Sequence, residues 1–179
     1  MEWRLDVDRA DEQFLLELLN TTPVADGVDL DELADADAGR AWLRDRGRDA
    51  SPEEWRAVRA ARDDLQAVVR GTADPATLAG WLERLTWQPT LDTDGVHWTW
   101  DQPSGRTAAA AAVLAWSALR KSSPGRLRPC GNPECRLFLI DHSKPNSARW
   151  CSMAVCGNRM KARRHYGRVR QSAAAEPRH

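Results

Sequence analysis

All four cysteines of this 179-residue chain lie within residues 130–156. Cys130 and Cys135 form one pair, and Cys151 and Cys156 form another; four residues separate the members of each pair, and fifteen separate the pairs. Two local pairs joined by a loop can present four thiolates to one ion, and a tetrahedron of thiolates is the usual shell of structural zinc. The spacing therefore predicts a single zinc site made by these four cysteines.

The rest of the chain indicates the compartment in which the cysteines work. The opening residues MEWRLDVDRADEQ are acidic and lack the apolar core of a secretory signal, and no apolar run is long enough to cross a membrane. We therefore expect a cytoplasmic protein with no membrane partner, in which thiols stay reduced and clustered cysteines favour metal. Buried metal-free thiols, a thiol redox switch and His142 as a replacement ligand are the alternatives.

The residues between the two pairs predict how the site is assembled. Residues 137–140 (LFLI) are typical of a short strand, residues 144–147 (KPNS) of a turn, and residues 148–150 (ARW) of a returning strand. Ser152 can cap a helix that runs through Cys156 to about residue 170. We therefore expect a hairpin that joins the pairs, with the last pair at a helix N-terminus, where the dipole favours thiolates.

The charges of the chain are divided between its two parts. Residues 1–119 carry 12 Arg/Lys and 23 Asp/Glu, a net charge of −11, whereas residues 120–179 carry 14 and 3, a net charge of +11. Such asymmetry suggests that the basic part meets a polyanion. The same two net charges would also result from an acidic and a basic surface that are both simply solvated. They would result as well from an acidic part that folds over the basic helix and shields it.

The helix expected after Cys156 is basic on most of its surface. Residues 159–170 contain six Arg/Lys and no acidic residue, and only Ala162, Tyr166 and Val169 form an apolar stripe. A helix that packs against a core has a wider stripe, so this helix is better supplied for phosphates than for burial. An arginine-rich helix also fits the major groove of duplex DNA.

The basic residues have two expected roles. Arg136, Arg149 and Arg159 lie beside ligands and can offset the negative charge of a zinc tetrathiolate, whereas residues further along the helix are better placed for phosphates. The candidate nucleic-acid-binding residues are Lys144, Arg149, Arg159, Lys161, Arg163, Arg164, Arg168 and Arg170.

The first 119 residues are mainly helical in pattern. Phe14, Leu15, Leu18 and Leu19 recur at helical spacing. Two helices are predicted to begin with a capping residue followed by a proline, at residues 51–54 and 74–75. Asp37 is predicted to cap another helix. The alanine-rich residues 107–119 have high helix propensity.

A different period interrupts these helices near residues 85–101. Val96, Trp98 and Trp100 alternate with polar residues, which predicts a half-buried strand of a β-hairpin. For the eight tryptophans outside the cysteine segment, core packing is a better explanation than ligand stacking. We find no phosphate loop, metalloprotease motif or nucleophile elbow, and therefore expect no enzyme.

These patterns together predict a mainly α protein with a small β-hairpin, in the α+β class. A helical domain of residues 1–122 contains the hairpin near 85–101, and a treble-clef-like zinc finger with a β-hairpin and a basic helix spans 127–170. We expect residues 171–179 to form a disordered tail.

The cysteine segment carries a dense motif. Its positions are Cys130 and Cys135, Leu137 and Phe138, Asp141 and Ser143, Arg149 to Met153, and Cys156 to Arg159 with Lys161. This motif resembles the CGNR zinc finger family. One departure is Lys144, where the family pattern has Arg; Lys can reach a phosphate but lacks the bidentate fork of Arg. Upstream, Phe14, Asn20, Thr21, Trp42 and Leu43 resemble the ABATE domain that usually precedes this finger.

The resemblance implies a bacterial, stress-induced transcription regulator that holds one structural Zn²⁺ and binds double-stranded DNA through its finger. We expect the N-terminal domain to serve as a sensor or regulatory module, which allows a small-molecule effector. A structural zinc module for protein–protein interaction and a thiol redox sensor are the alternatives. The sequence leaves the oligomeric state open, a homodimer included.

Overall fold

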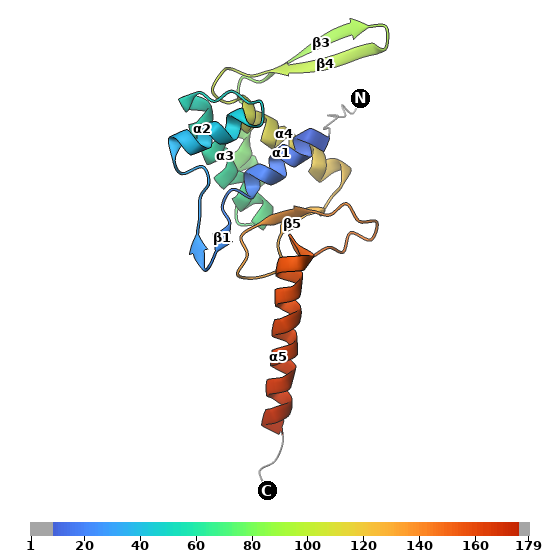
Figure 1. Ribbon diagram of the computed structural model, residues 1–179. Coiled ribbons are helices and arrows are strands. Elements are labelled where there is room, and N and C mark those ends of the chain that lie inside the picture. Colours follow the sequence, from blue (N-terminus) through green and yellow to red (C-terminus); the bar gives the residue numbers. More distant parts are fainter. Residues whose placement is uncertain (1–8, 176–179) are drawn as a thin grey trace.

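A computed structural model of the chain describes residues 9–175 and shows a helical body with two projections (Figure 1). The β3–β4 hairpin extends from one end of the body, and the long helix α5 extends from the opposite end. The elements are, in order, α1 (Arg9–Leu19), β1 (Val24–Ala25), β2 (Val28–Asp29), α2 (Ala36–Arg44), α3 (Pro52–Arg70), the 3₁₀ helix η1 (Pro75–Leu82), β3 (Thr86–Asp92), β4 (Gly95–Asp101), α4 (Thr107–Ser122), β5 (Leu127–Pro129), β6 (Phe138–Ile140), the π-helical turn η2 (Met153–Gly157) and α5 (Asn158–Ala175).

The core of the body lies where α1, α3 and α4 meet. The predicted apolar face of α1 is confirmed, because all four of its residues are buried. The alanine-rich α4 lets its neighbours approach closely, and its small side chains are almost all buried. The buried residues of this core include Phe14, Leu15, Leu18, Leu19, Leu43, Val58, Leu65, Ala112, Val113 and Leu119.

The start of α3 ties two helices together. Ser51 caps α3 by accepting a hydrogen bond from the Glu54 backbone N–H at 3.2 Å, as predicted. The Glu54 carboxylate, however, is fully buried and accepts hydrogen bonds from the backbone N–H groups of Thr107 and Ala108 at the start of α4. One carboxylate therefore caps a helix 53 residues away in sequence.

Other helix boundaries differ in detail from the sequence expectation. Asp35, rather than Asp37, caps α2 by accepting hydrogen bonds from the N–H groups of Asp37 and Ala38. Gly71 ends α3 with φ of +76°, the left-handed conformation that favours glycine. The helix that starts at Pro75 is a 3₁₀ helix rather than an α-helix.

The hairpin predicted near residues 85–101 forms, but its environment differs from the prediction. β3 and β4 pair antiparallel along their whole length, and Trp87, Pro89 and Leu91 lie opposite Trp100, Trp98 and Val96. Because side chains alternate across a strand, these six residues share one face. We expected that face to be half-buried in a core; instead no helix packs extensively against it among residues 9–175.

The tryptophans also divide between the helical core, where they are buried or partly buried, and the hairpin, where two of them are exposed. Trp42 is buried, and Trp55, Trp81 and Trp116 are partly buried against the core, as predicted. Trp87 and Trp98 of the hairpin are exposed, so core packing does not explain them.

The finger joins the body through a strand pair that the sequence did not predict. We expected residues 137–140 to pair with residues 148–150, but β6 pairs antiparallel with β5. Residues 148–150 form no strand and are held instead by the Gly131 N–H, which donates to the Arg149 carbonyl at 2.7 Å. Phe138 of β6 is 1% exposed and belongs to the same core as the helices, so finger and body share one core.

The C-terminal helix is longer than expected. Ser152 caps η2 by accepting from the Val155 N–H, and α5 then continues to Ala175, so residues 171–175 are helical rather than part of a tail. Residues 176–179 of the expected tail lie outside the described part of the chain. Within residues 9–175, no helix is both long enough and apolar enough to cross a membrane.

Candidate functional site: a four-cysteine metal centre and a basic helix

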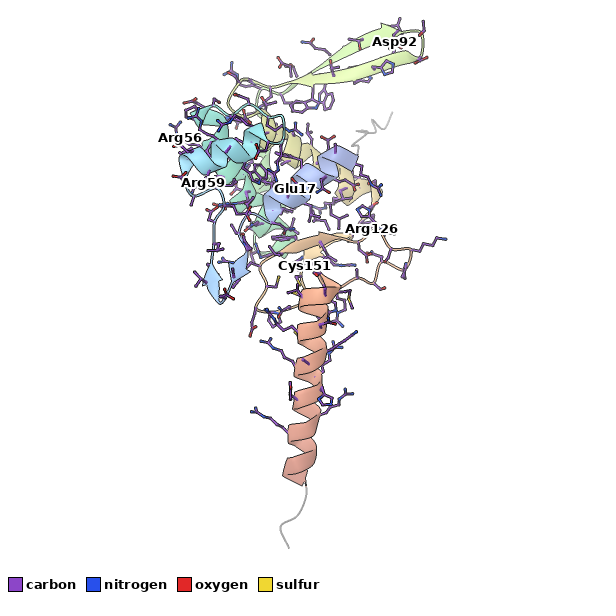
Figure 2. The ribbon with its side chains drawn as sticks, viewed as in Figure 1. Glu17, Arg56, Arg59, Asp92, Arg126 and Cys151 are labelled. Atoms are coloured by element: carbon purple, nitrogen blue, oxygen red, sulfur yellow. The ribbon has the colours of Figure 1, made fainter. Side chains whose placement is uncertain are left out.

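The sulfur atoms of the four cysteines converge at the base of α5 (Figure 2). All four Sγ atoms lie within 4.8 Å of one another, and Cys151 Sγ lies 3.7 Å from both Cys135 Sγ and Cys156 Sγ. Zinc–sulfur bonds of about 2.3 Å place the sulfurs of a tetrahedron about 3.8 Å apart, whereas a disulfide needs about 2.05 Å. The spacing therefore fits a zinc tetrathiolate and excludes disulfides.

The first cysteine pair lies in the connection between β5 and β6. The Cys130 N–H donates to the Leu137 carbonyl at 2.8 Å, and the Cys135 N–H donates to the Asn132 carbonyl at 2.9 Å. The fully buried Asn132 side chain accepts from the Glu134 N–H at 3.3 Å and donates to Cys156 Sγ at 3.5 Å. Asn132 thus shapes the turn and links the first pair to the second.

The second pair is brought to the first by close backbone packing. The Cys151 N–H points to Cys130 Sγ at 3.5 Å. A Cβ atom on Gly131 would lie 3.1 Å from both the Arg149 carbonyl oxygen and the Trp150 ring, and one on Gly157 would lie 3.0 Å from the Met153 side chain. Gly131 therefore lets the two segments that carry the ligands approach closely, because the carbonyl and the ring beside it have little room to move, whereas the flexible Met153 side chain beside Gly157 can shift.

The loop between the pairs is organised by Asp141. Its carboxylate accepts from the N–H groups of Ser143 and Ala148 at 2.8 and 2.7 Å, and from the Arg128 guanidinium at 2.6 Å. Hydrogen bonds from Ser143, together with those from Ala148 and the charge of Arg128, lower the pKa of Asp141 to about 2. The carboxylate therefore stays charged at neutral pH and holds β5 to the loop.

Two thiols of the cluster, those of Cys135 and Cys151, are protonated at neutral pH when no metal is bound. Burial raises the pKa of Cys135 to about 11 and also raises the pKa of Cys151. Burial opposes ionisation of Cys156 as well, but hydrogen bonds from Asn132 and neighbouring thiols lower its pKa below the usual value. Zinc supplies the positive charge that makes four thiolates stable side by side, and it must displace protons to bind.

The metal centre and its surroundings match a known family. Residues 126–169 match the CGNR zinc finger. The CGNR finger of this chain therefore holds one zinc site, whose ligands are Cys130, Cys135, Cys151 and Cys156. No match to an ABATE domain accompanies it, so that assignment of the N-terminal part remains a hypothesis. A comparison with curated proteins finds no match.

The candidate nucleic-acid residues of the CGNR finger fall into separate places. Lys161, Arg163, Arg164, Arg168 and Arg170 lie exposed along α5, whose side chains radiate into solvent in Figure 2. Arg159 lines a hollow of about 540 Å³ at the base of α5. Lys144 is exposed on the loop that Asp141 organises, and Arg149 lines another hollow of about 430 Å³ with Arg128. The structure does not gather all eight into one patch.

Acidic groups already occupy part of this basic surface. Arg163 of α5 forms an ion pair with Glu134 of the first cysteine pair's turn, and Arg136 forms one with Asp29 of β2. Beyond its first turns α5 points away from the body (Figure 1), so the body does not cover the helix. Glu134 belongs to the finger itself, whereas Asp29 of the acidic part pairs with Arg136 and, with Asp26, lines one hollow with Arg159 at the base of α5.

Sequence reasoning missed the contacts that hold the CGNR finger on the body. The Arg70 guanidinium donates to the Arg136 carbonyl at 2.7 Å and lies 4.3 Å from the centre of the Phe138 ring. The side chain of Asn20 contacts the backbone of Phe138 on the other side. Asn20 and Arg70 lie far from the finger in sequence, and no local pattern points to such contacts.

Proposed function

We propose that this protein binds double-stranded DNA through α5, with the zinc ion fixing the start of that helix. The observation that carries the proposal is a helix that begins beside a zinc ligand, projects from the body and exposes basic side chains around its surface (Figures 1 and 2). Cys156 lies in the turn that leads directly into α5. Zinc therefore sets the direction in which the basic helix leaves the body.

The chemistry of α5 suits phosphates more than a protein partner. Its described residues from Lys161 to Arg168 are all exposed, and their apolar content is limited to Ala162, Gly167 and the ring of Tyr166. Protein interfaces have apolar centres that are depleted in charge, whereas DNA contacts rely on Arg and Lys. A single helix of this width enters the major groove.

Transcription regulation in the bacterial cytoplasm, without enzymatic activity, is the wider role that we propose for such binding. The helical body would then carry the regulatory part, including any small-molecule effector. Its attachment to the finger through Phe138 and Arg70 supports this idea, because a change in body packing would reach β6 directly.

The test is fluorescence anisotropy of the full chain on a labelled 30-base-pair duplex, with zinc-loaded protein over ~50–300 mM salt. We expect log affinity to fall linearly with log salt with a slope of about −3 to −4, as for three or four phosphate contacts. Protein whose zinc has been removed by a chelator should bind at least about tenfold more weakly. Affinity that is independent of salt and of zinc would refute the proposal and favour a protein-docking zinc module.

A further inference from the structure

The β3–β4 hairpin is amphipathic and stands apart from the body. One face carries Trp87, Pro89, Leu91, Val96, Trp98 and Trp100, and the other carries threonine, glutamine, histidine and aspartate. The apolar side chains are open to solvent: Trp87 is 38% exposed, Leu91 78%, Val96 58% and Trp98 42%. Exposure is greatest at the tip pair, Leu91 and Val96, which lies furthest from the body.

A hairpin of this kind needs a partner. A two-stranded ribbon is at best marginally stable alone in water and gains stability when its apolar face is covered. A contiguous apolar patch of several hundred Å² on a small protein is often functional. We propose that the apolar face of the β3–β4 hairpin packs face to face against the same face of a second copy of this chain.

The exposed area fits a dimer. The four most exposed side chains present on the order of 450 Å² of apolar surface per copy, or about 900 Å² for two copies. A standard interface buries about 1,600 Å², of which about 65% is apolar in homodimers, or about 1,000 Å². The hairpin alone thus supplies almost all of the apolar area that a stable dimer needs.

The shape of the face is complementary to itself. Along the ribbon, a pair of large aromatics (Trp87 and Trp100) is followed by Pro89 and Trp98 and then by the smaller Leu91 and Val96. A twofold axis through the middle pair places the small tip of one copy over the large base of the other. Large side chains then meet small ones, as dense packing requires.

The charges of the hairpin select against other partners. Residues 85–105 contain Asp92, Asp94 and Asp101 and no lysine or arginine. Nucleic acids and anionic membrane surfaces are therefore disfavoured. Face-to-face packing leaves the carboxylates on the outer faces, whereas pairing tip to tip would bring Asp92 and Asp94 of both copies together. Because hairpin and α5 lie at opposite ends (Figure 1), such a dimer leaves both basic helices open.

The test is sedimentation velocity of the zinc-loaded full chain from about 1 to 100 µM. We expect a monomer–dimer equilibrium that the double variant Leu91→Glu/Val96→Glu weakens at least about tenfold. The matched control Thr90→Glu/Thr99→Glu adds the same charge on the opposite face and should still dimerise. A wild-type protein that is monomeric throughout would overturn the proposal, and would mean that another segment of the chain or a different protein covers the face.

A second readout does not depend on the variants folding. A photo-crosslinking amino acid at position 96 should yield a covalent dimer whose crosslinked peptide maps to residues 86–101 of the other copy. Crosslinks that map to α5, or none at concentrations where the protein is dimeric, would place the interface elsewhere and overturn the proposal.

Discussion

The carboxamide of Asn20 brackets the backbone of Phe138: its Oδ1 accepts from the Phe138 N–H at 2.7 Å, and its Nδ2 donates to the Phe138 carbonyl at 3.3 Å. The side chain imitates a neighbouring strand and occupies both backbone groups of a residue whose ring lies in the core. One residue at the end of α1 therefore fastens strand β6 of the finger to the helical body.

Replacement of this clamp should destabilise the whole protein. Asn20→Ala removes two hydrogen bonds to backbone groups and should lower the free energy of unfolding by about 1–2 kcal/mol. Urea unfolding of the zinc-loaded protein measures this change in the free energy of unfolding. The control Gln88→Ala, on the exposed polar face of the hairpin, should change stability by less than about 0.5 kcal/mol. A variant as stable as wild type would show that the bracket contributes nothing.

The zinc site should be required for more than the finger. Cys151→Ser removes a ligand that lies 3.7 Å from two others, so bound zinc should fall from one per chain to about zero. Because Phe138 belongs to the core that finger and body share, loss of zinc should also lower the stability of the helical body toward unfolding. The neighbouring variant Ser152→Ala, which removes only a helix cap, should keep its zinc. Retention of zinc by Cys151→Ser would contradict the ligand assignment.

Zinc binding should release protons. Burial raises the pKa of Cys135 to about 11 and also raises that of Cys151, so these thiols are protonated at pH 7 without metal, while Cys156 has a lowered pKa. Zinc should therefore displace at least about two protons per ion at pH 7, from Cys135 and Cys151, and its affinity should rise about 100-fold or more per pH unit as the pH is raised toward 7. Calorimetry in buffers of different ionisation enthalpy counts the protons. Fewer than about two would indicate that the thiols are already ionised.

The ion pair between Arg163 and Glu134 should restrain DNA binding. Hydrogen bonding to Arg163 lowers the pKa of Glu134, so its carboxylate is charged at neutral pH and competes with phosphate for the arginine. Glu134→Gln should bind duplex DNA about two- to fivefold more tightly at 0.1 M salt. Glu32→Gln, an equal charge change on the exposed surface of the body, is the control. Equal affinities for the two variants would argue against this competition.

Local sequence patterns predicted the individual helices and strands better than they predicted which of these elements pair or pack with one another. The cysteine spacing, the apolar face of α1 and the cap at Ser51 depend on residues close in sequence, and the structure agrees with them. The pairing of β5 with β6 was missed because Leu127–Pro129 is too short to show a strand period and contains a proline. Alternation near Trp98 identified an apolar face, but periodicity does not tell whether anything covers that face.

The central claim is that zinc fixes a basic helix that binds duplex DNA, and a charge-reversal pair on α5 tests it most directly. Lys161→Glu/Arg164→Glu changes two exposed residues of the helix, while the control Arg44→Glu/Lys121→Glu changes the net charge equally on the body. Anisotropy over a salt series should show at least about tenfold weaker binding and a shallower salt slope, by about 2, for the helix variant alone, with one zinc per chain retained in both. The same affinity and slope for wild type and both variants would contradict the account.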